Sequence, residues 1–469
     1  FFSTQTTAYE IGVRLVGSEM CIRDRLKTGN GDYKEIRLEE NKSSRITYSG
    51  KVRENISINS RLGGSVRAMA NGGWGFSSFN DIYQAPQKMK ETLTLAKYNS
   101  NELFEIEKNN PIRTKISPVL KKDPRKIKLS EKINILDHYK DLILSQEDIE
   151  SCDIIYADTD RKVVFADSKG NNIEQNFIHV VLRIAAYSSD GNEMLQSGFS
   201  IGSLGDYGII ENLDSEILDC AKKAKDLIDA PKVEGKETTV VLDQILAGVF
   251  VHEAFGHLSE ADNVYENERL KEILTLGKKF GNKDLNITDG AKIPNLRGSY
   301  EFDDEGTPAT KTPLIREGIL TGRLHSNETA NKMSEEATGN ARAISFAFPP
   351  IVRMSNTIIE NGKDKKEDII KDTKDGLYVK NWYGGMTEHE MFTFSSAETY
   401  RIENGEIKET LRPVKLSGNL FTTLKNINGI ADDLLINQGG GCGKGGQMPL
   451  PVSNGSPHIR INKCLVSNG

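Results

Sequence analysis

Alternation of polar and apolar residues at period two dominates the first 200 residues of the chain. It appears first in four short runs, YKEIRL, SRITYS, ISINSR and SVRAMA, at 33–38, 44–49, 56–61 and 65–70. Such alternation is typical of strands that face the core on one side and water on the other. We therefore expect a meander with turns at Gly50 and at Gly63-Gly64, forming a half-buried antiparallel sheet.

The same pattern returns after residue 150, and helical signals lie between and after the two groups. Further alternating runs occupy 153–158, 162–167, 177–188 and 194–203. Helices are expected over 81–100, where Pro86 limits the start, over 131–144 and over about 215–228. These signals predict a mixed α+β unit with no compact catalytic string.

Length bounds the number of domains. A chain of 469 residues is too long for one ordinary core, and the stretch 231–235 offers a boundary. We expect an N-terminal α+β domain over 32–232, with a mixed antiparallel sheet and helices, and a C-terminal β-rich domain over 236–469. The second domain opens on the β-branched run TTVVLD at 238–243, and the fold class expected for the whole chain is α+β.

Residues 8–25, AYEIGVRLVGSEMCIRDR, have a different character. They resemble translated sequencing-adapter read-through, so we expect residues 1–31 to be a non-native segment outside the fold. Cys21 would then not be a biological thiol. The alternative is an ordinary amphipathic N-terminal segment.

Charge, hydropathy and cysteine usage exclude several classes of protein. A net charge of -6 and a pI near 5.8 give no basic footprint for nucleic acid. The apolar run nearest the motif described below, 245–251, is far shorter than the roughly 20 residues that cross a bilayer, so no membrane span is expected. The five cysteines are scattered and odd in number, which favours a reducing cytoplasm over a disulfide scaffold.

The string HEAFGH at 252–257 carries the strongest chemical signal. Its spacing, HExxxH, sets two imidazoles five residues apart with a carboxylate after the first. Five residues rotate an ideal α-helix by roughly 500°, which leaves His252 and His257 about 140° apart. A π-bulge would bring them to one side, and Gly256 would tolerate the distortion. Glu253 would then lie beside the open position of a bound metal, where a carboxylate can take a proton from water.

A catalytic zinc needs a third protein ligand, and the residues alone leave it open. The candidates are His138, His179, His325, His389, His458, Glu260 and Cys442. A lone histidine is more often hydrogen-bonded or exposed than a ligand, and an acid such as Glu260 is usually solvated. Cys442 lies in the glycine-rich segment GGGCGKGG, which can press its backbone against another element. If the HExxxH spacing arose by chance, its histidines and glutamate would be ordinary core and surface residues. The acids Asp303, Asp304 and Glu305 are expected to be solvated residues of a turn.

Several strings from residue 252 onward form a combined pattern. They are HEAFGH, the segment RGSYEFDDEGTPATKTPLIREGILTG at 297–322, TGNARA at 338–343, RMSNT at 353–357 and CGKGGQ at 442–447. Together they resemble the TldD/PmbA family of metallopeptidases, on its metal-bearing TldD side. The resemblance covers the chain from about residue 32 to its end.

The resemblance implies zinc held by His252, His257 and Cys442, with Glu253 as general base. It also implies a peptidase for unfolded or small peptides, and assembly with a second subunit. That partner would be a metal-free PmbA/TldE-like paralogue in a heterodimer, or an identical chain. We expect an extended peptide to lie along a strand edge of the second domain.

Two rival interpretations remain open. One is a non-catalytic scaffold or partner subunit with a structural or vestigial metal site. The other is a hydrolase that uses Cys442 as nucleophile with a histidine base.

Overall fold

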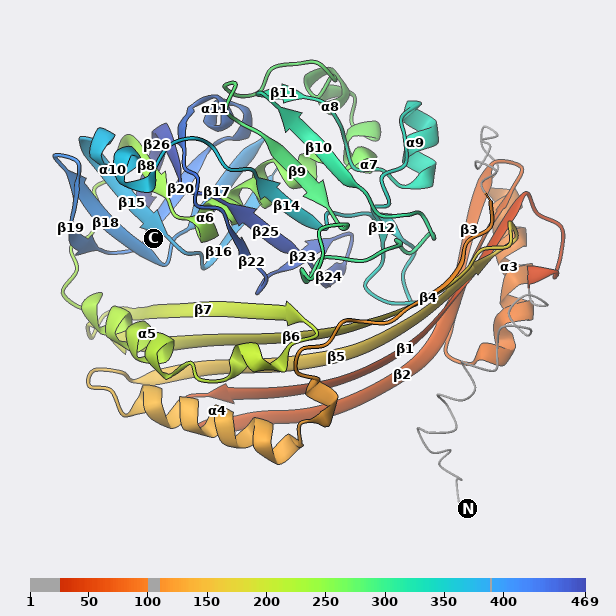
Figure 1. The fold of residues 1–469 in the computed structure, drawn as a ribbon, viewed down its shortest axis with the longest axis horizontal. Coiled ribbons are helices and arrows are strands. Elements are labelled where there is room, and N and C mark those ends of the chain that lie inside the picture. The colour runs from red at the N-terminus through yellow and green to blue at the C-terminus, as the bar shows by residue number, and fades with distance from the viewer. Residues whose placement is uncertain (1–25, 100–109, 389) are drawn as a thin grey trace.

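A long, curved sheet spans the N-terminal part of the chain and carries the C-terminal part on its concave side (Figure 1). The computed structural model describes residues 26–99, 110–388 and 390–469. Its mixture of helices and sheets confirms the α+β class expected from the sequence. Residues 1–25, with the adapter-like segment and Cys21, lie outside the described residues, as does His389. Residues 26–31, also expected outside the fold, are described, and Leu26 is buried in the core beneath α3.

Within the described residues, seven strands form the N-terminal sheet, in the order β3-β2-β1-β5-β6-β4, with β7 paired to β6. Their bounds are β1 (Tyr33–Ser49), β2 (Val52–Ala70), β3 (Gly73–Phe79), β4 (Arg113–Ile116), β5 (Ser151–Asp167), β6 (Asn172–Ser189) and β7 (Met194–Leu204). β1 pairs antiparallel with β2 and with β5 over nearly its whole length. The alternating runs therefore belong to a few long strands, several of which hold two runs each.

The expectation of a turn at Gly63-Gly64 is wrong, because both glycines lie inside β2. A Cβ on Gly63 would overlap the ring of Phe346, and one on Gly64 would lie 2.7 Å from the Arg37 carbonyl oxygen. These glycines allow close packing on the sheet rather than a chain reversal. Gly50, with φ of 54°, does sit in the turn between β1 and β2.

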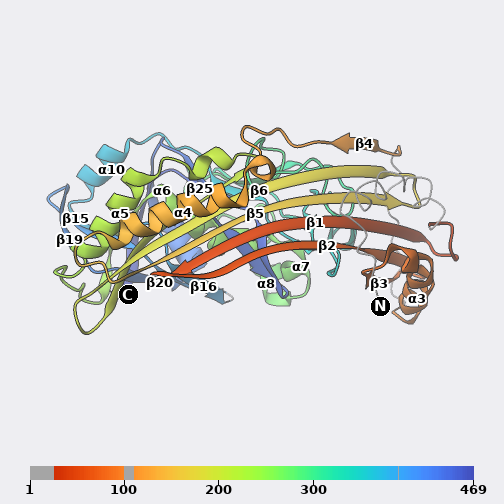
Figure 2. The same cartoon turned by 90° about the horizontal axis from the view of Figure 1, so that it is seen from below.

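Three helices cover the convex face of the sheet (Figure 2). They are α3 (Ala85–Tyr98), α4 (Leu129–Leu144) and α5 (Asp214–Asp226), which confirms the three helices expected from the sequence. Short 3-10 helices η1 (Ile82–Gln84), η2 (Pro124–Lys126) and η3 (Tyr207–Ile210) accompany them. α4 and α5 bury residues such as Ile46 and Ile154, while α3 packs over Ile36 and Val66.

The concave face is also covered over residues 33–40 of β1, so this half of the strand is buried on both faces. The alternation expected of a half-buried sheet holds in the second half of the strand. Glu35, Arg37 and Glu39 are each at most 5% exposed, because the C-terminal part lies against them. Arg37 Nη2 donates to the carbonyl oxygens of Ser345 at 2.9 Å and Phe348 at 3.0 Å. The polar residues of the period-two pattern at the start of β1 therefore form an interface with the C-terminal part instead of facing water.

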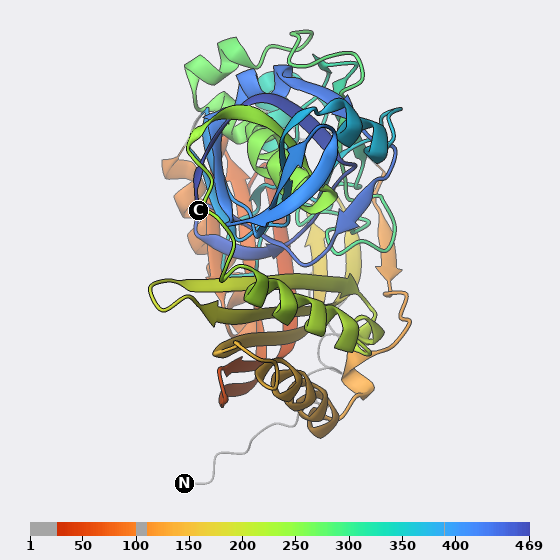
Figure 3. The ribbon, with the colours of Figure 1, turned by 90° about the vertical axis from the view of Figure 1, so that its left-hand side faces the viewer.

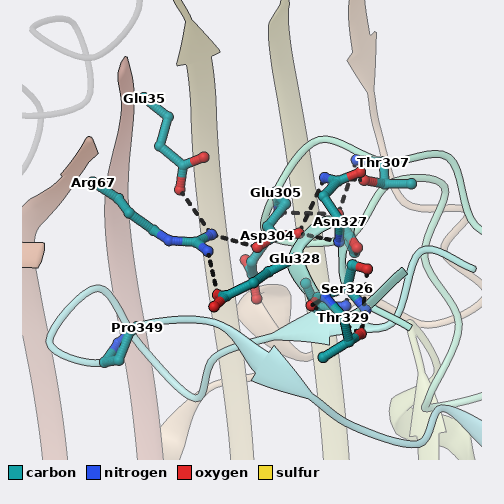
Figure 4. Close-up of polar contacts among 12 residues, drawn as sticks. Glu35, Arg67, Asp304, Glu305, Thr307, Ser326, Asn327, Glu328, Thr329 and Pro349 are labelled. Atoms are coloured by element: carbon teal, nitrogen blue, oxygen red, sulfur yellow. Dashed lines mark hydrogen bonds and ion pairs between the residues drawn. The ribbon is translucent and has the colours of Figure 1, made fainter. Parts of the chain in front are cut away.

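Figure 4 shows the ionic core of this interface. Arg67 of β2 pairs with Glu305, and lies 3.7 Å from Glu35 and 3.6 Å from Glu328. Asn327 Nδ2 donates to Glu305 Oε2 at 3.1 Å. The expectation that Glu305 and its neighbours at 303 and 304 are solvated is therefore wrong, since the sheet and the C-terminal part enclose them.

The C-terminal part is rich in strands, as expected. One sheet has the order β11-β10-β9-β14-β25-β22 and a second has β16-β17-β20-β26-β8-β15-β18-β19, with β21 on β26; the pairs β12-β13 and β23-β24 are separate. The strands are β8 (Lys236–Leu242), β9 (Ile287–Gly290), β10 (Lys311–Arg316), β11 (Ile319–Leu320), β12 (Ala341–Arg342), β13 (Ile351–Val352), β14 (Asn356–Ile359), β15 (Asp375–Lys380), β16 (Gly384–Glu388), β17 (Met391–Ser395), β18 (Glu398–Glu403), β19 (Glu406–Leu411), β20 (Val414–Asn419), β21 (Ile427–Ile430), β22 (Leu435–Asn437), β23 (Gly441–Lys444), β24 (Gln447–Pro451), β25 (Ser453–Ser456) and β26 (Ile459–Asn468).

Short helices connect these strands. They are α6 (Gln244–Val251), α7 (Ala261–Tyr265), α8 (Glu268–Ile273), α9 (Asn327–Met333), α10 (Lys366–Asp372) and α11 (Leu420–Lys425). Figure 3, seen along the long axis, shows the C-terminal part above the sheet and α4 and α5 below it. No helix in the described part of the chain is long and apolar enough to span a bilayer.

Candidate metal centre

The helix α6, which leads into HEAFGH, is fixed at its start and along one side. Asp243 Oδ1 accepts from the Leu246 backbone N–H at 2.9 Å, which is an N-cap, and from Asn381 N–H at 3.0 Å. A Cβ on Gly248 would lie only 3.3 Å from Gly455 of β25, so this glycine lets helix and strand approach closely. The motif therefore starts from a rigid support.

The expected helix distortion is present at the motif itself. His252–Gly256 form a π-helical turn, in which the His257 N–H donates to the His252 carbonyl oxygen. The two imidazole centroids are consequently 5.3 Å apart, with ring planes at 78°. Gly256 is required at this point, because a Cβ there would overlap the sulfur of the buried Met354. The π-bulge inferred from the spacing is confirmed.

Cys442 reaches the same point from β23, 185 residues later. Its Sγ lies 3.5 Å from His257 Nε2, and donor atoms of His252, His257 and Cys442 all lie within 4.8 Å of one another. The fully buried Arg353 holds the β23-β24 hairpin, donating to the carbonyl oxygens of Cys442 at 2.9 Å and Gln447 at 3.2 Å. Of the candidates for a third ligand, the fold brings Cys442 to the histidine pair.

The glycines before Cys442 explain how β23 is held in place. Gly439 lies against β7, where Ser200 Oγ donates to its carbonyl oxygen at 2.9 Å and a Cβ would overlap the Ser200 backbone. Arg297 donates to the carbonyl oxygens of Gln438, at 3.2 Å, and Gly440. The segment presses its backbone against another element, as the glycine content suggested.

The electrostatics of the cluster favour a thiolate at Cys442. Burial alone would raise the pKa of the Cys442 thiol, but the charges and hydrogen bonds of His252 and His257 lower that pKa to about 5. Burial alone would lower the pKa values of His252 and His257, but the charges of Cys442 and Glu260 raise them, so a bound metal would displace protons from the imidazoles. His252 Nδ1 is buried without a hydrogen-bond partner in the described part of the chain. A thiolate, two converging imidazoles and an unpaired ring nitrogen fit a tetrahedral divalent ion such as zinc.

Glu260 is not solvated, contrary to expectation. The chain leaves the π-turn through η5 (His257–Ser259), which turns Glu260 inward to 0% exposure. Its Oε2 accepts from His257 Nδ1 and from Lys444 Nζ, both at 3.0 Å. Burial would raise the pKa of Glu260, but Lys444 and His257 lower it to about 2. Because Nδ1 is bonded to this carboxylate, Nε2 is the nitrogen that faces Cys442.

Glu253 keeps a more open position than the three donors. Its side chain is 26% exposed, and its Oε2 lies 3.9 Å from His257 Nε2. The carboxylate is thus next to the cluster and accessible from outside it.

The remaining candidate ligands lie in other interactions. His138 contacts Asp214 at 3.0 Å, His325 contacts Glu335 at 3.1 Å and His458 contacts Asp433 at 2.7 Å, while His179 belongs to the N-terminal sheet. None of these joins the His252, His257 and Cys442 cluster within the described ranges. Sequence reasoning missed Arg353 and Lys444, although both belong to strings that carry the family resemblance, RMSNT and CGKGGQ.

Comparison with known proteins gives matches along most of the chain. Family models described as PmbA/TldA metallopeptidase match in three segments: domain 1 at 35–97, the central domain at 122–230 and the C-terminal domain at 235–468. A metalloprotease of Synechocystis sp. is 44% identical over 437 residues, covering 93% of this chain and 94% of the relative. A zinc metalloprotease TldD homolog of Saccharolobus solfataricus is 29% identical over 92% of this chain and 96% of its own.

A solved structure has the same fold. TldE from Thermococcus kodakarensis superposes with a TM-score of 0.75 at 17% identity, covering 96% of this chain and 99% of that one. With matches along nearly its full length to a relative and to the family models, the chain belongs to the PmbA/TldD family of metallopeptidases.

Proposed function

We propose that this protein is a zinc-dependent peptidase that hydrolyses unfolded or small peptides, with His252, His257 and Cys442 as the zinc ligands. The convergence of their donor atoms within 4.8 Å is the observation that supports it most strongly. The name of one relative, a zinc metalloprotease, agrees with this choice of metal. Zinc, when bound, supplies Lewis acidity for the peptide carbonyl and the attacking water.

Glu253 is the proposed general base and acid. It takes a proton from water during attack on the peptide carbonyl and returns it to the leaving amine. Its partial exposure beside His257 supports this role, because the group must meet both water and substrate. Glu260 acts differently: its contact with His257 Nδ1 orients the ring and fixes the tautomer.

The edge strand β16 is the proposed binding site for an extended peptide. It ends the nine-stranded sheet and contacts the π-helical turn, and its outer edge has no partner among the described strands. A peptide added there would make main-chain hydrogen bonds, which are indifferent to side chains. Broad specificity follows, so cleavage confined to one sequence would contradict this placement.

Elemental analysis and peptide hydrolysis test the proposal together. We expect about one zinc per chain in the parent protein and a large loss of zinc in Cys442→Ala, as for a three-ligand site. Glu253→Gln should keep its zinc yet lose peptide hydrolysis by roughly 10²- to 10⁴-fold. A parent that binds no zinc when metal is supplied, or a fully active Glu253→Gln, would favour the scaffold interpretation.

A thiol nucleophile is the second candidate, because Cys442 lies 3.5 Å from His257 and has a pKa of about 5. Its 2% exposure counts against direct attack on a peptide. If zinc is the cofactor, chelators should abolish hydrolysis, and iodoacetamide should label Cys442 only after chelation. A thiol hydrolase would show the reverse on both counts.

We also propose assembly with a second subunit, a metal-free PmbA/TldE-like paralogue or a second copy of this chain. The fold shared with TldE from Thermococcus kodakarensis supports the first form. Light scattering of the chain alone and after co-expression with such a paralogue distinguishes the two. The boundary at 232–236 and the cytoplasmic location stay predictions from the sequence.

A further inference from the structure

A cavity of about 340 Å³ lies between the concave face of the sheet and the C-terminal part. Its floor includes Phe177 and His179 of β6, and its other walls include Arg297, Tyr300, Arg342 and Leu450. Figure 1 shows β5 and β6 passing beneath the C-terminal strands β23 and β24. The cavity is therefore enclosed by elements far apart in sequence.

Two buried arginines in this wall have no acidic partner. Arg297 and Arg342 are each 8% exposed, and neither forms an ion pair with a carboxylate within the described part of the chain. Arg342 donates to the carbonyl oxygens of Met354 at 2.6 Å and Pro451 at 2.7 Å, while Arg297 also donates only to carbonyls. Arg297 Nε has no acceptor among the described atoms. Buried charge of this kind is costly unless a counter-ion compensates it.

Among the described residues, no acid that lines the cavity pairs directly with either arginine, although the charge of Asp304 acts on Arg342 from a greater distance. Asp304 is shared between Arg37, at 3.4 Å, and Arg161, at 3.2 Å. Burial, followed by the charge of Glu305, raises the pKa of Asp303 well above its usual value, which favours its neutral form. The cavity thus combines an excess of positive charge with aromatic and aliphatic walls.

The cationic end of the cavity lies close to the metal centre. Arg297 binds the carbonyl of Gly440, two residues before Cys442, and two residues of chain extend at most roughly 7 Å. Leu450, which lines the cavity, pairs directly with Cys442 across the β23-β24 hairpin. An extended peptide rises about 3.3 Å per residue, so a group held at Arg297 would lie only a few residues from the cleaved bond.

We propose that this cavity binds a carboxylate of the peptide substrate, at its C-terminus or on an acidic side chain, through Arg297 and Arg342. Guanidinium groups pair with a carboxylate by charge-assisted hydrogen bonds that a neutral amide cannot match. The apolar walls then receive the adjoining side chain. The identity of the ligand as a peptide rests on the proposed peptidase function.

Binding to the zinc-loaded Glu253→Gln protein tests the proposal without turnover. The probes are N-terminally labelled random hexapeptides, one pool with free C-termini and one amidated, measured by fluorescence anisotropy. The free acids should bind about tenfold more tightly or better, as expected for charged hydrogen bonds. Equal affinity for both pools, or no binding of either, overturns the proposal. Amidated peptides with a single Glu or Gln then reveal whether a side-chain carboxylate also binds.

A charge change on the N-terminal sheet tests whether the arginines of the cavity cause the preference for free acids over amidated peptides. Arg183 is exposed on β6, and its charge acts on Arg297. Arg183→Glu places a carboxylate of the protein itself near Arg297, where it competes with the carboxylate of the peptide, and should reduce the preference for free acids severalfold or more. Arg113→Glu makes the same charge change on β4, away from the cavity lining, and should leave the preference intact. An unchanged preference in Arg183→Glu, or an equal loss in both variants, overturns the assignment.

Hydrolysis by the parent protein separates this inference from the proposed function. Cleavage of both pools with equal kcat/KM would support a peptidase and overturn the carboxylate site. Tighter binding of the free acids with no cleavage of either pool would support the site and refute the peptidase.

Discussion

Glu260→Gln is the sharpest test of how the proposed metal centre is held, because it changes charge without changing shape. Glu260 is fully buried, and its Oε2 accepts from His257 Nδ1 and Lys444 Nζ at 3.0 Å. Its Oε1 accepts from the Met354 backbone N–H at 3.3 Å. Every neighbour of this carboxylate is therefore a donor.

The amide of glutamine can satisfy only one side of this arrangement. If its oxygen stays with His257 and Lys444, its NH₂ group faces the Met354 N–H, and two buried donors oppose each other. An unsatisfied buried donor costs about 1–3 kcal/mol of folding free energy. Loss of the negative charge beside His257 should also weaken zinc binding by about 10- to 100-fold, or about 1.4–2.7 kcal/mol.

Competition between the protein and a chromophoric chelator measures the zinc affinity, and urea unfolding of the metal-free protein measures the stability. Glu266→Gln is the matched control, since Glu266 is exposed and lies just beyond α7. Zinc affinity in Glu260→Gln within twofold of the parent would refute the view that this carboxylate positions His257.

Three further changes test other parts of the structure. Gly256→Ala should destabilise the protein by about 1–3 kcal/mol through overlap with Met354, and a smaller effect in the Met354→Ala background, measured by urea unfolding, would confirm that cause. Arg353→Met should lower zinc affinity, because the carbonyls of Cys442 and its hairpin lose their donor; unchanged affinity in the chelator assay would contradict this. Burial raises the pKa of Glu35 to about 7, so the folded state keeps a proton that the unfolded chain releases near pH 4.5, and stability falls as the pH rises through 7. Glu35→Gln should flatten that fall in melting temperatures measured from pH 5 to 8, and an unchanged slope would exclude Glu35 as its source.

The sequence predicted the site best where a local rule determined the geometry. The five-residue interval between His252 and His257 is incompatible with a regular helix, and Gly256 permits the π-turn that resolves the conflict. Spacing alone left the third ligand open, since Cys442 comes from a distant hairpin. The family resemblance implied Cys442 as the third ligand, and the fold brings Cys442 to the two histidines.

Errors arose where a residue's environment depends on distant chain segments. Period-two alternation indicated strands correctly, but it also predicted that Glu35 and Arg37 face solvent. Both are buried, because the C-terminal part that covers them lies some 270 or more residues further along the chain. Glu260 was misjudged for a related reason: the chain turns inward after the π-helix instead of continuing as an amphipathic helix. Gly63 was assigned to a turn, although its small size is needed for contact with Phe346.

The two parts of the protein meet within a few residues of the proposed thiolate ligand, so the N-terminal sheet should influence zinc binding. Gly439 touches Ser200 of β7, and a Cβ on it would overlap that strand's backbone, whereas a Cβ on Gly440 would meet only the Asn454 side chain at 3.8 Å. Gly439→Ala must therefore displace the segment that leads to Cys442, while Gly440→Ala has room. We expect zinc affinity to fall at least about tenfold in the first variant and little in the second, as for other changes around metal ligands. Equal affinities in the two variants would mean that the β23 hairpin holds its ligand independently of the sheet.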